Sequence, residues 1–239
     1  MTPFVAEAVR LLRRELDGRT PVIGFCGAPF TLAAYLVQGE GKEGFGALKT
    51  MLYREPATLE HLLERLTDAM IDYLRLQIAA GAQAVQIFDS WAGLLAPAHY
   101  VPFALRWVQA LVAGVADLGV PVIYFVNGSP HLLEHAATSG ADVLGVCWRT
   151  PLDVVAARVG PGIALQGNLD PHALFATPEE VSRLALDVLK RVAGRPGHIM
   201  NLGHGILPET PIASVEALVA AVQTATTRTT DERLPACTP

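Results

Sequence analysis

The sequence predicts an α/β fold in which parallel strands alternate with helices. Six short apolar runs, each the length of one buried strand, alternate with longer stretches whose apolar residues recur at helical spacing. Most of these runs stop abruptly at polar residues or glycines. In parallel α/β folds the carboxyl ends of the strands hold the functional site, so these run ends are where we expect ligand contacts.

Size and composition fit a single globular domain. The 239 residues are 51% hydrophobic and 17% charged, which is enough to bury a large core. A net charge of −5 argues against a nucleic-acid partner, and we find no uninterrupted apolar run long enough for a membrane span. Three widely spaced cysteines form no CxxC pair, and we see no secretory signal at the start. We therefore expect a cytoplasmic protein without a metal site.

The first half of the chain supplies three strands. The predicted elements are, in order, a helix at 4–16, a strand at 21–26, a helix at 30–37, a helix from 56 to about 81, a strand at 84–88, a helix at 102–118 and a strand at 121–126. Strand 84–88 is followed directly by Asp89 and Ser90. An acid and a hydroxyl at the carboxyl end of a buried strand are candidates for ligand contact.

The second half repeats the pattern. It comprises a helix opened by Ser129-Pro130, a strand at 142–148, a helix opened by Thr150-Pro151, a strand at 163–166, a helix opened by a capping box at Thr177–Glu180, a strand at 198–202 and a helix at 211–225. Residues 226–239 read as a polar C-terminal tail.

Two observations favour a closed barrel over a doubly wound sheet. The turn after the first strand does not match GxGxxG, and no GxxxxGK[ST] loop occurs in the chain. Polar groups are also spread over many strand ends. A TIM-like barrel needs eight strands, so we predict a single, incomplete barrel domain over 1–225 with about six of the eight βα units. Its edge strands, at 22–26 and 198–202, would lie unpaired and promote association.

Four stretches of the chain resemble the uroporphyrinogen decarboxylase family. They are GFCGAPFTLAAYLVQG (24–39), QIFDSWAG (86–93), LQGNLDP (165–171) and NLGHG (201–205). The resemblance implies a (β/α)₈ barrel that binds a tetrapyrrole at the strand carboxyl ends. It implies conversion of uroporphyrinogen III to coproporphyrinogen III, removing four acetate carboxyls as CO₂ without cofactor or metal. It also implies a role in haem and porphyrin biosynthesis and a homodimer.

The departures from the family concern the chemistry itself. Decarboxylation of a pyrrole acetate needs a protonated ring and a negative group that stabilises the resulting cation. The family's Arg-Gln-Ala-Gly-Arg-Tyr motif, and the aspartate that grips the pyrrole nitrogens, do not occur in the 239 residues. We therefore predict no catalytic residue here and expect a truncated form with impaired activity. In addition, Cys147 stands where the family commonly has aspartate.

Three residues are predicted to bind substrate through the same resemblance: Tyr35, Ser90 and His204. Read alone, Tyr35 also fits core packing and Ser90 fits a helix cap. His204 lies between two glycines, which permit close backbone approach to a ligand, and its imidazole can donate to a carboxylate. Because the three residues follow three different strands, we expect them to converge on one cleft at the carboxyl ends.

Other polar residues at strand ends have an ordinary explanation. Asp89, Asn168 and Asp170 can act in turns or caps as readily as in binding. Three alternatives to an active decarboxylase stay open. The chain could be a methyltransferase of the same fold superfamily, although it lacks the His-x-Cys pair of a thiolate zinc site. It could be a fragment that binds porphyrinogen weakly or folds only in part, or one half of a split protein.

Overall fold

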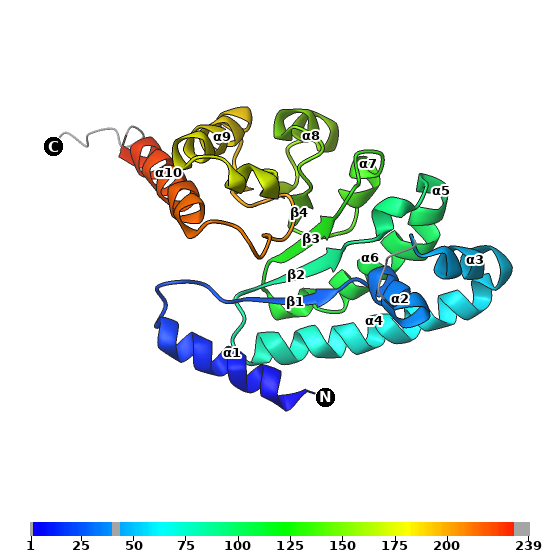
Figure 1. Ribbon diagram of the computed structural model, residues 1–239. Helices are drawn as coiled ribbons and strands as arrows, with labels where there is room; N and C mark the ends of the chain where they lie inside the picture. The colour runs from blue at the N-terminus through cyan, green and yellow to red at the C-terminus, as the bar shows by residue number, and fades with distance from the viewer. Residues whose placement is uncertain (1, 40–43, 232–239) are drawn as a thin grey trace. The chain divides into compact units, whose positions relative to one another are not determined.

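The predicted α/β organisation is confirmed in a computed structural model that describes residues 2–39 and 44–231 (Figure 1). The chain divides into two compact units, Met1–Gly145 and Val146–Pro239. Strands follow one another in the order of the chain, and the pairings β1–β2, β2–β3 and β5–β6 are parallel. The expectation of one domain over 1–225 stays a prediction.

The first unit places helices over a parallel sheet. Its strands are β1 (Ile23–Gly27), β2 (Ala84–Asp89), β3 (Val122–Val126) and β4 (Val143–Val146), the last residue of which falls in the second unit. Its helices are α1 (Pro3–Leu16), α2 (Pro29–Gln38), α3 (Gly46–Arg54), α4 (Pro56–Ala79), α5 (Pro97–Tyr100), α6 (Arg106–Ala113) and α7 (Leu133–Ala136). Short helical turns η1 (Ala92–Leu94), η2 (Val101–Leu105) and η3 (Ala116–Leu118) link some of them.

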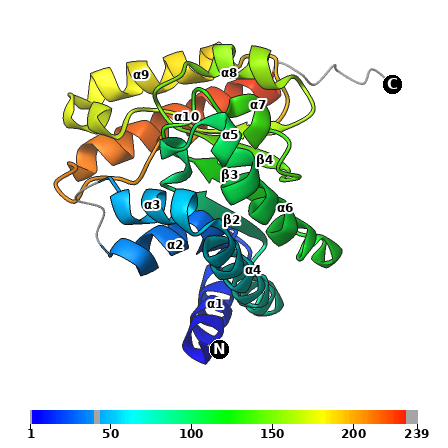
Figure 2. The same ribbon diagram turned by 90° about the vertical axis from the view of Figure 1, so that its right-hand side faces the viewer.

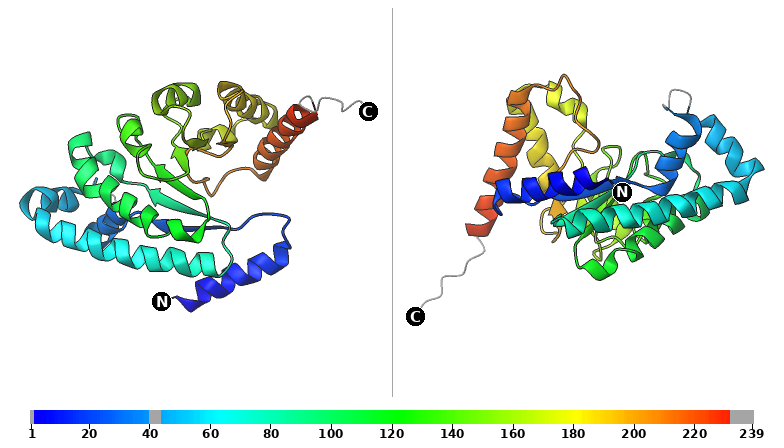
Figure 3. Two further views of the ribbon diagram at one scale, coloured as in Figure 1. Left: turned by 180° about the vertical axis from the view of Figure 1, so that it is seen from behind. Right: turned by 90° about the horizontal axis from the view of Figure 1, so that it is seen from below.

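The long helix α4 covers one face of this sheet (Figures 1 and 3). Leu59, Leu63 and Leu74, spaced along one side of α4, are fully buried, as expected for an amphipathic helix on a sheet. The strands alternate accordingly. Strand register aligns Cys26, Ile87 and Tyr124, and all three side chains are buried.

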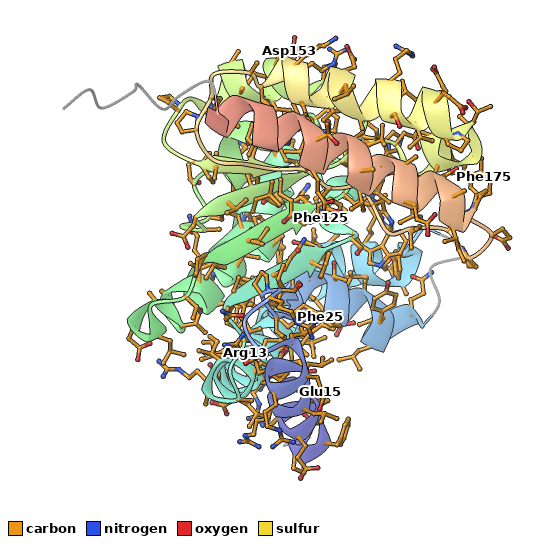
Figure 4. All side chains as sticks on the ribbon, turned by 90° about the vertical axis from the view of Figure 1, so that its left-hand side faces the viewer. Arg13, Glu15, Phe25, Phe125, Asp153 and Phe175 are labelled. Atoms are coloured by element: carbon orange, nitrogen blue, oxygen red, sulfur yellow. The ribbon has the colours of Figure 1, made fainter. Side chains whose placement is uncertain are left out.

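The opposite face of the sheet bears aromatic rings. Phe25, Phe88 and Phe125 form a series in which successive ring centroids lie 6.0 Å apart; Phe25 and Phe125 are labelled in Figure 4. The Phe25 side chain is 58% exposed, whereas Phe125 is buried. Exposure of this face therefore grows toward the β1 edge of the sheet.

Strand β1 lies at one end of the sheet, as predicted, but a side chain covers part of its outer edge. Gln77, a buried residue of α4, turns its carboxamide against the strand. The Phe25 N–H donates to Gln77 Oε1 at 3.0 Å, and Gln77 Nε2 donates to the Phe25 carbonyl at 2.9 Å. Both backbone groups of this residue are thereby satisfied without a neighbouring strand.

One helical segment among the described residues, Pro97–Leu118, is long and apolar enough to cross a membrane by length and composition alone. The core helix of a globular protein passes the same test. Tyr100, Trp107 and Leu111 of this segment are buried inside the first unit, so packing within the unit accounts for its apolar character.

The second unit comprises α8 (Leu152–Val159), β5 (Ala164–Gln166), η4 (Pro171–Phe175), α9 (Pro178–Arg191), β6 (His198–Ile199) and α10 (Ile212–Asp231). Helices α9 and α10 pack side by side (Figures 1 and 2). Helix α10 continues past 225, where the sequence placed the start of the tail; residues 232–239 lie outside the described part of the chain. The predicted strand at 198–202 shortens to β6, with one further bridge between Leu169 and Leu202.

Half of the predicted capping box is present at the start of α9. Thr177 Oγ1 accepts the Glu180 N–H at 3.3 Å. The Glu180 carboxylate, instead of reaching back to the cap, accepts hydrogen bonds from Nε and Nη2 of Arg183 at 2.8 and 2.6 Å. The cap therefore satisfies one backbone donor rather than two.

Candidate functional site

Tyr35 and Ser90 both lie in the first unit, after the carboxyl ends of neighbouring strands β1 and β2. Tyr35 is on α2 and its side chain is 45% exposed. Its ring meets the rings of Phe45 and Trp91 edge-on, each at a centroid distance of 6.2 Å. Trp91 directly follows the half-buried Ser90. The structure thus places Tyr35 beside the segment that bears Ser90.

The three aromatic rings form one cluster. Phe45 and Trp91 lie 4.6 Å apart between centroids, and Phe45 is almost fully buried. A buried base with an exposed phenol at its rim can offer a hydroxyl to a ligand while the ring stays packed. Both readings of Tyr35 from the sequence, packing and ligand contact, are therefore compatible with its position.

Asp89, the last residue of β2, is fully buried and is linked to this cluster through Thr31. Its carboxylate accepts hydrogen bonds from Thr31 Oγ1 at 2.7 Å and from the Tyr124 hydroxyl at 3.0 Å. Burial raises the pKa of Asp89 to about 6, and the hydrogen bonds from Thr31, Tyr124 and the Ala92 backbone oppose that rise. The Asp89 side chain lies on the helix-covered face of the sheet, as Ile87 does. There its hydrogen bonds join β2 to α2 and β3.

His204 lies in the second unit beside Trp148 and Arg149. The His204 and Trp148 rings meet edge-on at 6.2 Å, and the Arg149 guanidinium stacks 4.0 Å from the centre of the Trp148 ring. Partial burial, and then the nearby charge of Arg149, lower the pKa of His204 below its usual value. At neutral pH the imidazole is therefore uncharged and keeps one N–H donor.

Gly203 brings this segment against Trp148. A Cβ added at Gly203 would overlap the Trp148 backbone, whereas a Cβ at Gly205 would have no neighbour within 4 Å. Gly203 is thus required for contact between two segments of the protein. We expected the glycines beside His204 to let the backbone approach a ligand. At Gly203 the close approach is instead to the Trp148 backbone.

Asn168 and Asp170 have structural roles. The buried Asn168 donates from Nδ2 to the carbonyls of Cys147, at 2.9 Å, and Thr150, at 2.6 Å. Asp170 accepts the His172 N–H at 2.9 Å and so caps the short helix η4. Cys147, at the position where the family commonly has aspartate, is buried. Its carbonyl helps to hold the loop after β5.

Three residues of these clusters did not emerge from the sequence as site candidates: Thr31, Trp91 and Arg149. Thr31 and Trp91 lie inside the motifs that carry the resemblance, four positions before Tyr35 and one after Ser90. Arg149 could have been found as the cation next to a strand end. Among the residues that the structure describes, no group of three His, Cys, Asp or Glu side chains could hold a metal ion.

The chain consists of sequential parallel βα units, and phenol, hydroxyl, imidazole and aromatic groups follow the carboxyl ends of its strands. This arrangement is typical of β/α proteins whose functional site lies at that end. A family model matches nearly the whole chain. The chain belongs to the uroporphyrinogen decarboxylase family, whose model matches residues 1–225.

Individual relatives agree with the family model. The chain is 49% identical over 220 residues to a uroporphyrinogen decarboxylase of Syntrophotalea carbinolica and 50% identical over 224 residues to one of Roseiflexus sp. strain RS-1. Each match covers 92% of this chain and 64% of the relative. The chain therefore spans just under two thirds of the length of these curated relatives.

Solved structures show the same fold at low sequence identity. A methyltransferase from Methanosarcina mazei aligns with a TM-score of 0.82 at 24% identity, over 94% of this chain and 64% of that one. A B12-independent methionine synthase from Shewanella sp. W3-18-1 aligns with a TM-score of 0.68 at 12% identity, over 95% and 67% of the two chains. These likenesses bear on fold alone.

Proposed function

We propose that this chain takes part in the decarboxylation of uroporphyrinogen III to coproporphyrinogen III, a step of haem and porphyrin biosynthesis. The observation that supports this most strongly is the family match along 1–225, because it includes all four motifs that surround the candidate site. The reaction is that of a carboxy-lyase acting without cofactor. Four acetate side chains become methyl groups, each losing CO₂ and gaining a proton.

In this proposal Tyr35, Ser90 and His204 bind carboxylates at the periphery of the tetrapyrrole. A phenol, a hydroxyl and a neutral imidazole each supply one hydrogen-bond donor to an anionic oxygen. The half-exposed Tyr35 and the position of Ser90 next to Trp91 support contact with ligand from the first unit. His204 belongs to the second unit, and its contact with the same ligand stays a prediction.

Arg149 extends the proposed contacts of the second unit. Its guanidinium stacks on Trp148, whose ring also meets His204. A stacked guanidinium keeps its N–H groups in one plane and can bind a carboxylate bidentately. In a chain of net charge −5, attraction of an acidic tetrapyrrole depends on such local positive charge.

The groups that carry out the reaction would lie outside the clusters around Tyr35 and His204. By resemblance, decarboxylation needs an aspartate facing the pyrrole nitrogens and arginines beside it, and residues 1–239 do not contain that motif. Asp89 is a poor substitute, since it is fully buried and its carboxylate already accepts three hydrogen bonds. Loss of one preorganised charge typically lowers kcat about a hundred- to a thousand-fold.

We therefore expect the 239-residue chain alone to bind uroporphyrin and to show little or no decarboxylation. Binding is measured by titrating the porphyrin absorbance, and turnover by incubating the chain anaerobically with uroporphyrinogen and separating coproporphyrinogen by chromatography. The intact Syntrophotalea carbinolica enzyme is the positive control. A fusion that adds the segment of that relative bearing Arg-Gln-Ala-Gly-Arg-Tyr should regain activity. Turnover of the chain alone near that of the control would refute this assignment.

Two further properties belong to the same proposal. We place the protein in the cytoplasm and expect it to work as a homodimer, as the family resemblance implies. The exposed apolar side chains of β1, Ile23 and Phe25, favour association of the isolated chain. Sedimentation velocity over a range of concentrations tests this, and a single monomeric species at every concentration would contradict it.

A further inference from the structure

A chain of buried hydrogen bonds connects to the aromatic cluster of the first unit. Thr31 Oγ1 donates to Asp89 Oδ1 at 2.7 Å, and the Tyr124 hydroxyl donates to Asp89 Oδ2 at 3.0 Å. The Tyr100 and Tyr124 hydroxyls lie 2.9 Å apart and share a further hydrogen bond. All four side chains are buried, and Asp89 is the member to which both branches connect.

Thr31 has a second contact that links this network to the candidate site. While its hydroxyl donates to Asp89, it accepts the backbone N–H of Trp91 at 3.2 Å. One hydroxyl therefore joins α2 to the loop after β2. A hydroxyl can fill both roles only because it has one proton and two lone pairs.

The two segments joined in this way bear the proposed ligand groups. Tyr35 follows Thr31 by four positions on α2, so the two side chains lie on the same side of the helix. Ser90 lies between Asp89 and Trp91, and both of these neighbours are held by the Thr31 hydroxyl. The Tyr35 and Trp91 rings complete the link on the outer side, 6.2 Å apart.

We propose that Asp89 and Thr31 are positioning residues, which fix Tyr35 and Ser90 relative to each other so that both can bind one ligand. This inference rests on the proposed function of Tyr35 and Ser90 as tetrapyrrole contacts. Asp89 itself stays away from ligand. Its carboxylate anchors the Thr31 hydroxyl, and Thr31 in turn holds the start of the Trp91 loop against α2.

Spectroscopy tests the geometry without any ligand. Thr31→Val keeps the shape of the side chain but removes both hydrogen bonds, whereas Thr31→Ser keeps the hydroxyl. We expect NMR resonances of the Tyr35 ring and the Trp91 indole to shift in Thr31→Val and to return near their original positions in Thr31→Ser. Ser129→Ala is the matched control, because the buried Ser129 hydroxyl donates to the Val126 carbonyl and has no tie to α2.

Binding of uroporphyrin, followed by its absorbance, tests the consequence. We expect Asp89→Asn and Thr31→Val each to raise Kd about ten-fold, and Tyr35→Phe to do the same. In the double variants Asp89→Asn/Tyr35→Phe and Thr31→Val/Tyr35→Phe, the second change should add less than about three-fold, since residues that act as one unit are not additive. Ser129→Ala should leave Kd unchanged.

The outcomes separate this inference from the proposed function. If the unaltered chain does not bind uroporphyrin, the proposed function of this chain is wrong, and the spectroscopic comparison still decides the positioning role. Unchanged Tyr35 and Trp91 resonances in folded Thr31→Val would overturn the inference. Fully multiplicative losses in the double variants would overturn it as well, because they would mean that Asp89 and Tyr35 act independently.

Discussion

At the scale of single residues, the environment of a side chain decides its role more than its place at a strand end does. Asp89 ends a strand and Asn168 and Asp170 follow one, and all three are engaged in hydrogen bonds that hold backbone or neighbouring elements. Tyr35 and His204, by contrast, combine a packed ring with exposure. Residues of that second kind can meet a ligand and keep a fixed orientation.

Asp89 should make stability depend on pH. Its pKa is about 6 in the folded chain and 3.8, the ordinary value, in the unfolded chain. The folded chain therefore holds the proton more tightly. This proton adds to the free energy of unfolding below pH 3.8, and the contribution, roughly 3 kcal/mol, is lost as pH rises toward 6. Urea unfolding from pH 4 to pH 8 should show this fall in the unaltered chain.

Asp89→Asn is the comparison that isolates the effect, because burial also lowers the pKa of His198 and His204 and so adds other contributions to the pH dependence. The asparagine variant should lack the fall between pH 4 and pH 6. Ser129→Ala should retain it. Parallel pH profiles for the unaltered chain and Asp89→Asn would show that Asp89 does not titrate in this range.

Gly203 should be intolerant of a side chain. In Gly203→Ala the new methyl group would overlap the Trp148 backbone, which cannot move aside as a flexible side chain can. We expect a loss of about 1–3 kcal/mol in the free energy of unfolding. Gly205→Ala is the matched control, as open space surrounds that position. Denaturant titration of the two variants, followed by Trp148 fluorescence, checks the difference.

At the scale of helices and strands, sequence periodicity predicted which helices and strands exist better than it predicted the residues at which they begin and end. The helix expected from Ser129-Pro130 begins only at Leu133, because the Ser129 hydroxyl bonds back to Val126 instead of capping the helix. The helix at Thr150-Pro151 forms without a side-chain cap. Local motifs predict where a helix can start, but tertiary contacts decide whether the capping group is available.

The orientation of β2 shows why part of the site escaped prediction. Alternation along a strand places Asp89 on the same face as Ile87 and opposite Phe88. Both faces of β2 are largely apolar in sequence, so the pattern alone does not say which face lies under the helices. The contacts of Asp89 with Thr31 and Tyr124 follow only from the folded arrangement. The motifs predicted the neighbourhood of the site, but not the network that holds it.

The cover on the β1 edge should be needed for stability and for protection against association. In Gln77→Leu the Phe25 N–H and carbonyl would lose their partners, at a cost of about 1–3 kcal/mol. The bared edge should also pair with other chains. Denaturant unfolding and sedimentation velocity measure the two effects. Gln109→Leu is the control, since Gln109 bonds to the Thr138 carbonyl on α6's exposed side; equal behaviour of both variants would contradict a protective role.

At the scale of the whole molecule, the α/β class and the strand order could be read from the sequence, whereas the division into two compact units could not. Regular βα alternation has no break near residue 145 that would mark a boundary. The proposed ligand contacts belong to both units, with Tyr35 and Ser90 in the first and His204 in the second. Each unit can therefore be tested for ligand binding by itself.

Tryptophan probes follow ligand binding in each unit separately. Trp91 and Trp107 report on the first unit and Trp148 on the second. Variants with a single reporter, the other positions being phenylalanine, allow each unit to be followed during heating. Uroporphyrin at a hundred times Kd should stabilise whatever it binds by about 2.7 kcal/mol. We expect Tm to rise at the Trp91 and Trp107 reporters; no rise there would contradict the proposed ligand contacts of Tyr35 and Ser90.

The graded exposure of Phe25, Phe88 and Phe125 also has a thermodynamic consequence. Any polypeptide that covers this face must remove apolar ring surface from water, since Phe25 is more than half exposed. Removal of apolar surface lowers the heat capacity of the complex relative to its parts. Association through this face should therefore have a negative heat-capacity change and weaken on cooling, so that complexes formed in the warm would partly dissociate in the cold.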